Sequence, residues 1–205
     1  MNGFEKRTQE KKNIILEAVV ELYCERGMEK VSIADIAEKA GVSQVSIYNY
    51  FQSKDNLACC AVTFYYEKLL QDFMDAIHSE LSFEEKVKQA FFEPMKKKST
   101  SLTGFWDSII GSKYREIALD YEKKLVPHML SFIKEGIEQG FFNKRYSKEA
   151  LLFYLSIYGE GAMNKLEAVS DSQAKAKLYD ELLDLFLYGV SGCEPEKAPY
   201  SSNGN

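Results

Sequence analysis

The stretch that decides the fold is residues 31–57, which read VSIADIAEKAGVSQVSIYNYFQSKDNL. Within it, Ser32, Ser43 and Ser53 each precede a short apolar pattern. A serine hydroxyl in that position accepts a hydrogen bond from a free amide of the first helical turn. Gly41 separates the first two patterns and permits a tight turn between them. The stretch therefore predicts two short helices joined at Gly41, followed by the start of a third.

Longer helices are predicted on both sides of this stretch. Before it, apolar residues recur at helical spacing, and we expect Gly27 to end that helix as a left-handed cap. These apolar residues are Ile14, Ile15, Ala18, Val19, Leu22 and Tyr23. After it, the helix capped by Ser53 is predicted to continue to Ile77.

The second short helix presents an unusual outer face. If its apolar residues pack against the first short helix, an uncharged set is left facing outward, and residues 42–53 hold no charged side chain at all. Gln and Asn can contact adenine in a bidentate manner, and Val can touch a thymine methyl group. Hydroxyl groups reach phosphates, as does a lysine beside a helix N-terminus. The outward residues are Gln44, Val45, Ser46, Tyr48 and Asn49, with Tyr50 and Lys54 placed for phosphates.

Residues 31–57 closely resemble the DNA-binding signature of TetR-type transcriptional regulators. The shared pattern is a hydroxyl residue before the second helix, then I-A, A-G-V-S, I-Y-x-Y-F and K-x-x-L, with Ser32 standing where the family more often has threonine. Residues 133–142, IKEGIEQGFF, resemble a stretch that precedes the last two helices of these proteins. The resemblance implies an all-α fold with a helix-turn-helix head. It also implies a homodimer formed by the last two helices.

Residues and resemblance together predict the candidate DNA contacts. They are Ser32, Ala34, Ser43, Gln44, Val45, Ser46, Tyr48, Asn49, Tyr50 and Lys54. Tyr48 and Tyr50 have a competing interpretation as core aromatics of a small bundle. A dimer suits the function, because two recognition helices must address half-sites about one DNA turn apart.

The overall charge argues weakly against DNA binding. The chain of 205 residues carries 26 Lys and Arg against 31 Asp and Glu, and residues 1–60 carry eight against nine. Any DNA contact must therefore arise from local placement rather than from a general positive field. A basic stretch, Lys6, Arg7, Lys11 and Lys12, is predicted to be either a solvated tail or an arm that reaches DNA.

The rest of the chain is also predicted to be helical. Ser82 with Glu85 and then Ser147 are expected to cap further helices, and residues 94–99 to connect two of them. A helix containing Trp106 follows that connection, and in the next, Pro127 is expected to kink or split the helix at Val126. Gly140 closes that helix, and the last runs from about Asp171 to Tyr188, with apolar residues at 182–187 pointing in nearly every direction.

We therefore predict an all-α protein of about nine helices with a three-helix DNA-binding head. The predicted domains are residues 1–53 for DNA binding, 54–190 for ligand binding and dimerisation, and a disordered tail at 191–205. No stretch is long and apolar enough for a membrane span, and the N-terminus lacks a signal-peptide pattern, so we expect a cytoplasmic protein.

Aromatic residues in the second domain suggest a ligand cavity, although core packing explains each of them as well. The candidate lining residues are Phe105, Trp106, Tyr114, Tyr121, His128, Phe132, Phe153, Tyr154, Tyr158 and Glu160. Gly159 and Gly161, which flank Glu160, are costly inside a helix and predict either close packing at the dimer interface or room for a ligand.

The sequence offers nothing for catalysis or metal binding. No nucleophile–base pair or phosphate loop is found, and the cysteines and histidines lack metal-ligand spacing, so we expect no enzyme activity, metal or cofactor. Cys59 and Cys60 are interpreted as small buried hydrophobic residues. The favoured function is a ligand-responsive repressor that binds a palindromic operator. The alternative is an architectural DNA-binding protein without an effector.

Overall fold

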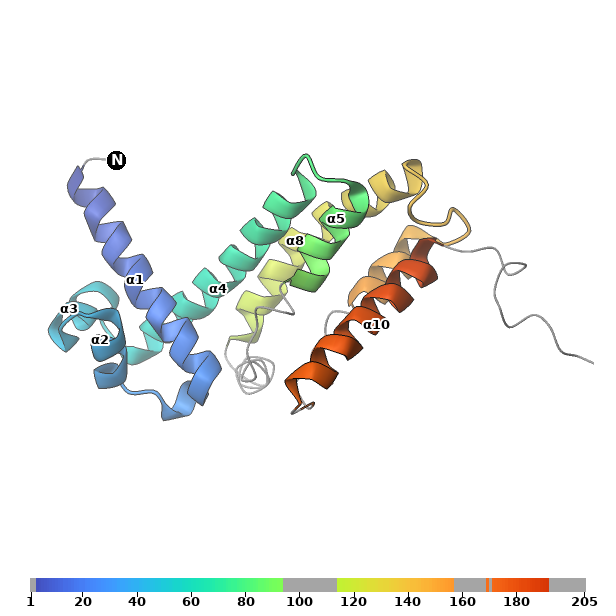
Figure 1. The fold of residues 1–205 in the computed structure, drawn as a ribbon. Helices are drawn as coiled ribbons and strands as arrows, with labels where there is room; N and C mark the ends of the chain where they lie inside the picture. Colours follow the sequence, from blue (N-terminus) through green and yellow to red (C-terminus); the bar gives the residue numbers. More distant parts are fainter. Residues whose placement is uncertain (1–2, 94–113, 157–168, 170, 192–205) are drawn as a thin grey trace, which may run out of the picture. The chain divides into compact units, whose positions relative to one another are not determined.

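The computed structural model describes residues 3–93, 114–156, 169 and 171–191 (Figure 1). In these residues every regular element is a helix, so the prediction of an all-α protein is confirmed. The residues group into two compact units. The head unit comprises residues 3–72 and 114–124, and the C-terminal unit comprises residues 73–93, 125–156, 169 and 171–191.

Three helices and the start of a fourth build the helix-turn-helix of the head unit (Figure 1). They are α1 (Gly3–Arg26), α2 (Ile33–Ala40), α3 (Gln44–Phe51) and α4 (Lys54–Ile77). Helix α1 packs against α2, and α2 packs against α3. Their shared core holds Ile15, Val19, Leu22, Ile36, Ile47 and Leu57, each at most 1% exposed. Burial of these side chains holds the short helices in place.

The predicted helix ends of the head are confirmed at three positions. Ser32 and Asp35 form a reciprocal capping box at the start of α2, and Gly41 ends that helix in the left-handed conformation, with φ of 64°. At the start of α4, the hydroxyl of Ser53 accepts from the backbone N–H of Asn56 at 3.0 Å. Local sequence therefore sets where these helices begin and end.

Two details of the head correct the sequence interpretation. Gly27 follows the last residue of α1 with φ of 80°, but its ψ of 150° is not that of a left-handed cap, and a short 3-10 helix, η1 (Met28–Lys30), comes next. The basic stretch beginning at Lys6 is helical, because α1 already starts at Gly3. It is therefore part of a helix and not a tail, and its contact with DNA stays a prediction.

The C-terminal unit is built around an aromatic core. Its elements are α5 (Phe83–Val87), the π-helix η2 (Lys88–Phe92), α8 (Arg115–Glu138) from residue 125 onward, a helix at 148–156, and α10 (Ser172–Ser191). The rings of Phe83 and Phe132 stack with centroids 4.5 Å apart, and Phe92 meets Phe186 edge-on at 5.1 Å. Aromatic pairs of this kind add to the free energy of burial.

Sequence signals again fix the helix ends of this unit. Ser82 and Glu85 form the predicted capping box, and the Ser147 hydroxyl accepts from the backbone N–H of Ala150 at 3.1 Å. Gly140 follows the end of α8 with φ of 78°. The π-helical turn was not predicted, because no simple sequence pattern marks a change from α to π hydrogen bonding.

Pro127 does not split its helix. Helix α8 runs without a break through Pro127, so of the predicted kink or split at Val126 the split is wrong and the kink stays a prediction. Proline removes one backbone hydrogen bond. The residues that follow, Met129, Phe132 and Ile133, are buried, and this burial favours continuing the helix.

Several predictions fall outside the described residues. They are the connection at 94–99, the helix containing Trp106, the segment around Gly159 to Gly161, and all of the predicted disordered tail at 191–205 except Ser191. Ser191 is the last residue of α10, so the prediction is wrong at that residue. The predicted domain boundary between residues 53 and 54 stays a prediction.

Gly136 provides a test of the aromatic core. A Cβ atom at this position would lie 2.5 Å from ring carbons of both Phe83 and Phe142. We expect Gly136→Ala to lower the free energy of unfolding by about 1–3 kcal/mol through overpacking, as measured by denaturant unfolding. The matched control is Gly189→Ala in α10, where the new Cβ would meet only the Tyr154 hydroxyl at 3.6 Å. An equally stable Gly136→Ala protein would contradict this description of the core.

Candidate nucleic-acid interface

Helix α3 is fixed at its start by a pair of serines. The Ser43 hydroxyl accepts from the backbone N–H of Ser46 at 3.1 Å, and the two hydroxyl oxygens lie 2.8 Å apart. Ser43 is exposed and Ser46 is half-buried. Both hydroxyls therefore already form hydrogen bonds at the start of α3, and a contact with DNA would use their remaining donor or acceptor capacity.

The outward face of α3 matches the set that the sequence predicts. Val45 is 67% exposed and Tyr48 is 48% exposed, which is unusual for large apolar side chains in a small domain. Gln44 and Asn49 are exposed beside them, whereas Ile47 is buried against the rest of the head. The structure thus brings amide, methyl and phenol groups together on one uncharged surface.

The other candidate DNA contacts surround this surface. Ala34 and Lys54 are exposed in the first turns of α2 and α4. Ser32 is exposed, but its hydroxyl and its backbone N–H both donate to the Asp35 carboxylate. Tyr50 is half-buried, with its ring edge-on to Phe51 at 6.4 Å. Tyr50 therefore combines a packing role with a partly accessible hydroxyl.

Ion pairs connect α2 to α1. The ammonium group of Lys39 lies 2.9 Å from the Glu21 carboxylate and 3.2 Å from that of Glu25, and these hydrogen bonds raise the pKa of Lys39. Arg26 lies 3.4 Å from Asp35, whose pKa is lowered mainly by the hydrogen bonds from Ser32 and further by Arg26. These exposed pairs contribute little energy each, and they add to the apolar contacts by which α2 packs on α1.

Two residues that sequence reasoning missed define the junction between α3 and α4. Gln52 has φ of 66°, and among the described residues other than glycine it alone has a positive φ. The side-chain amide of Asn56 donates to the carbonyl of Phe51 at 2.9 Å. The position of Asn56, three residues after the capping Ser53, was the available signal. Together these features set the angle at which α4 leaves α3.

The residues predicted to line a ligand cavity are divided between the two units. Tyr114 and Tyr121 belong to the head unit, whereas His128, Phe132, Phe153 and Tyr154 belong to the C-terminal unit. Phe132 is buried in the aromatic core, and Tyr154 stacks on Phe186 at 5.8 Å. Phe105, Trp106, Tyr158 and Glu160 lie outside the described residues. The cavity itself stays a prediction.

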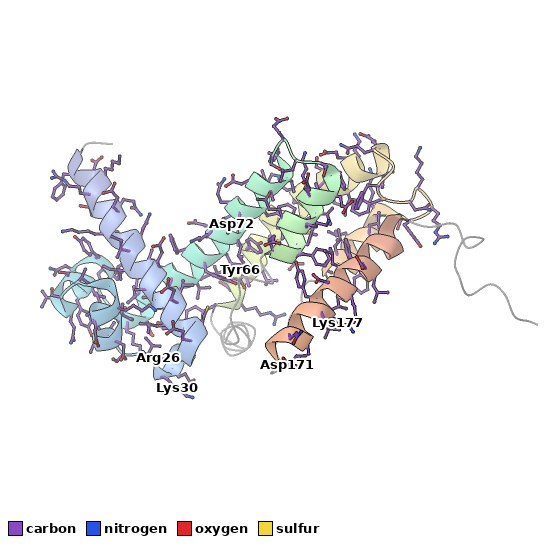
Figure 2. The ribbon with its side chains drawn as sticks, in the orientation of Figure 1. Arg26, Lys30, Tyr66, Asp72, Asp171 and Lys177 are labelled. Atoms are coloured by element: carbon purple, nitrogen blue, oxygen red, sulfur yellow. The ribbon has the colours of Figure 1, made fainter. Side chains whose placement is uncertain are left out.

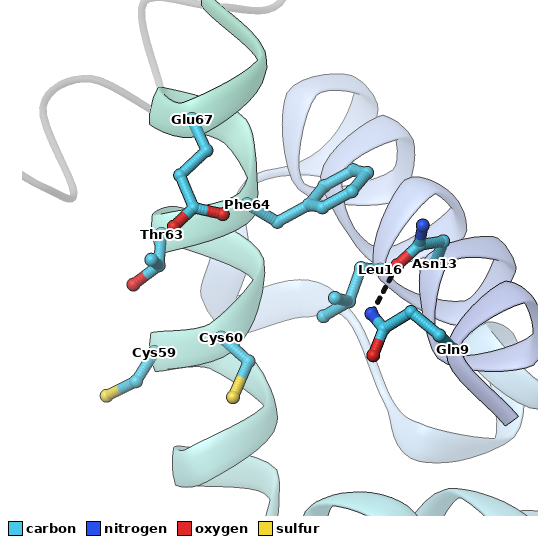
Figure 3. A pocket seen from close by; sticks show the side chains of 8 residues that line it. All are labelled: Gln9, Asn13, Leu16, Cys59, Cys60, Thr63, Phe64 and Glu67. Atoms are coloured by element: carbon cyan, nitrogen blue, oxygen red, sulfur yellow. Dashed lines mark hydrogen bonds between the residues drawn. The ribbon is translucent and has the colours of Figure 1, made fainter. Parts of the chain in front are cut away.

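A groove of about 450 Å³ lies between α1 and α4 in the head unit (Figure 3). The α1 side contributes Gln9, Asn13 and Leu16, and the α4 side contributes Cys59, Cys60, Thr63, Phe64 and Glu67. Both cysteines are half-buried, which corrects the expectation that they are buried. Their neighbours Ala58 and Ala61 are the residues that face the core.

The backbone of Gln52 provides a second test. A positive φ strains a residue that carries a Cβ atom, whereas glycine adopts it freely. We expect Gln52→Gly to raise the free energy of unfolding by about 1 kcal/mol, measured by denaturant unfolding. Gln52→Ala keeps the Cβ atom and serves as the control, for which no such gain is expected. A gain of equal size in both variants would show that the side chain, not the backbone, is responsible.

Known proteins share both this motif and this fold. Residues 15–58 match the family model described as bacterial regulatory proteins, tetR family. The HTH-type transcriptional regulator YvdT of Bacillus subtilis is 39% identical over 80 residues, which is 39% of each chain. The HTH-type transcriptional repressor KstR2 of Mycobacterium tuberculosis is 24% identical over 134 residues, which is 62% of this chain and 67% of that protein. The chain thus spans about two fifths of YvdT and two thirds of KstR2.

Solved structures extend the likeness to nearly the whole chain. A TetR-family regulator from Cytophaga hutchinsonii gives a TM-score of 0.68 at 14% identity, covering 92% of this chain and 98% of that one. The structure of KstR2 of Mycobacterium tuberculosis gives 0.62 at 18% identity, covering 89% and 95%. At these identities the likeness shows a shared fold. The sequence and geometry of the helix-turn-helix agree with the family model, so residues 15–58 are a DNA-binding domain of the tetR type, and the described residues share the all-α fold of tetR-family regulators.

Proposed function

We propose that this regulator is a ligand-responsive repressor that binds a palindromic operator as a homodimer and is released by a small molecule. The observation that carries the proposal is the exposed, uncharged surface of α3, on which Val45 and Tyr48 stand out from a well-packed head. A solvent-facing helix normally carries charges, so this surface is better suited to base edges than to water.

Some groups of this surface suit DNA bases, and others suit DNA phosphates. The amides of Gln44 and Asn49 suit adenine, and the Val45 methyl groups suit a thymine methyl. The Tyr48 hydroxyl suits a phosphate, which sets the position of the protein on DNA without reading sequence. Ser43 and Ser46 form hydrogen bonds at the start of α3, and their hydroxyl groups can form further hydrogen bonds with the DNA phosphates.

Positive charge near this surface is sparse. Lys54 is exposed at the first residue of α4, where backbone amides also favour a phosphate. The other basic groups of the region lie on the first turns of α1, where Lys6, Arg7 and Lys11 are exposed. Because few phosphates are neutralised, we expect a shallow dependence of affinity on salt concentration.

The homodimer is supported by apolar side chains left exposed in the C-terminal unit. Phe153 is 68% exposed on the helix at 148–156, and Leu185 is 67% exposed on α10. Tyr154 and Phe186, the neighbours of these residues in sequence, stack on each other. The two exposed side chains therefore belong to helices that pack together, and a second copy of the chain would cover them.

The effector is proposed to act on the C-terminal domain and to weaken DNA binding, which requires DNA to weaken effector binding equally. Repression is supported by the name of one relative, KstR2. Action on DNA places the protein in the cytoplasm. None of the helices in the described residues is both long and apolar enough to cross a membrane. The second candidate, an architectural protein, uses the same head without an effector, and a thermal-shift screen of small molecules separates the two.

Tyr48 tests the DNA-binding surface. We expect Tyr48→Ala to weaken binding to DNA from the chain's own upstream region by about tenfold or more, because a hydroxyl contact to a phosphate is lost. Electrophoretic shift at several salt concentrations measures the effect. Leu81→Ala, which removes another exposed apolar side chain, serves as the control and should bind normally. Absence of sequence-selective, salt-sensitive binding by the unaltered protein would overturn the proposal.

Leu185 and Phe153 test the dimer. We expect Leu185→Glu combined with Phe153→Glu to give a monomer in sedimentation equilibrium, because a carboxylate in an apolar interface lacks a partner. Leu119→Glu places the same charge at a third exposed apolar position on α8 and should leave the dimer intact. A doubly substituted protein that remains dimeric would place the interface elsewhere.

A further inference from the structure

Tyrosines gather where the start of α8 meets the helices of the head unit. Tyr23 lies on α1, and Tyr65 and Tyr66 lie on α4. Tyr114 is the residue before α8, and Tyr121 lies near the start of α8. Figure 2 shows Tyr66 on α4. Tyr114 and Tyr121 had been predicted to line a ligand cavity. That role stays a prediction, and the structure places both residues in the head unit, where Tyr121 packs against Tyr66.

Ring contacts join α8 to α4. The rings of Tyr66 and Tyr121 lie with centroids 4.8 Å apart at an interplanar angle of 32°. Tyr65 meets Tyr66 edge-on at 5.7 Å, and Tyr66 is 4% exposed. Pairs at these distances and angles are favourable beyond the area they bury.

The residue before α8, Tyr114, lies near Tyr23 of α1. Tyr23 and Tyr114 are both buried, and burial together with the nearby Tyr114 raises the pKa of Tyr23 to about 12. The Tyr114 carbonyl accepts from the backbone N–H of Ile117 at 3.0 Å, so Tyr114 forms part of the first turn leading into α8. Burial also raises the pKa of Tyr121 to about 12. These phenols stay neutral at physiological pH and pack as aromatic residues.

Helices α1 and α4 are the supports of the recognition helix. The ion pairs of Lys39 orient α2 on α1, and the junction at Gln52 connects α3 directly to α4. A change in the spacing of α1 and α4 would therefore change how α3 is presented. Helix α8 runs without interruption from Arg115 to residues buried in the core of the C-terminal unit, such as Phe132.

We propose that Tyr121 and Tyr114 are positioning residues for DNA binding. Tyr121 holds α4 through its ring contact with Tyr66, and Tyr114, buried near Tyr23, supports α1, so that α3 is presented to the operator. This inference rests on the proposed DNA-binding function. It states that residues at the start of α8 influence the affinity for DNA. The two tyrosines touch neither DNA nor effector, and they act only through the helices that they hold.

The test uses the full chain and a DNA duplex that the unaltered protein selects from a randomised pool. We expect Tyr121→Leu to weaken binding to that duplex about tenfold, within the range found for residues that couple distant sites. Tyr121→Phe keeps the ring contact and should bind within about twofold of the unaltered protein. Tyr66→Leu should match Tyr121→Leu, and the double variant should be little weaker than either, because both remove one contact.

A merely structural role is separated by a matched control. Phe142→Leu trims a fully buried aromatic ring in the C-terminal unit and should lower the unfolding midpoint while leaving the affinity of the folded protein unchanged. Hydrogen exchange without DNA gives an independent readout. Amides around Tyr23 on α1 and Tyr66 on α4 should exchange at least about fivefold faster in Tyr121→Leu, but not in Phe142→Leu.

The possible failures can be told apart. If the unaltered protein selects no DNA, the proposed function is wrong, and hydrogen exchange still decides whether α8 holds α1 and α4. If the unaltered protein selects DNA but Tyr121→Leu binds as tightly, the positioning role is wrong. Unchanged exchange of α1 and α4 in Tyr121→Leu, or an equal loss of affinity in Phe142→Leu, would also overturn it.

Discussion

The head depends on one constraint, which is that α2 and α3 are each only eight residues long. Isolated helices of this length are not stable in water. They persist because serine caps satisfy their first amides and because Ile36 and Ile47 are buried in the core of the head. Because caps and burial keep α3 folded, its outward side chains are not needed for stability and can be uncharged. The same dependence makes the helices α1 and α4 the natural place for regulation.

Charge has a secondary role in this protein. The chain carries more acidic than basic residues, and the basic groups near α3 are few. Three ion pairs join α1 to α2, and the charges of these side chains are paired within the protein. Selectivity is then expected to come from amide, methyl and hydroxyl groups that fit base edges, with modest help from the phosphate backbone. An acidic overall composition is compatible with such a surface.

The C-terminal unit follows a different principle from the head. Its core is filled by aromatic rings so closely that Gly136 leaves no space for a methyl group beside Phe83 and Phe142. Phe132, chosen from sequence as a cavity residue, is one of these core rings. At the same time, Phe153 and Leu185 remain exposed on two helices that pack together. Aromatic character alone did not distinguish core, contact surface and cavity, because each environment favours the same residue types.

The sequence by itself determined the all-α class, the helix ends at Ser32, Gly41 and Ser53, and the outward set on α3. These features are local, because capping, turn conformation and helical spacing depend on residues within one or two turns. Tertiary structure decided the rest: that α1 begins at Gly3, that α8 continues through Pro127, and that Tyr114 and Tyr121 pack in the head unit with Tyr23 and Tyr66. Packing between residues far apart in the chain settles such points, since burial can offset a local preference and no local pattern records the partner.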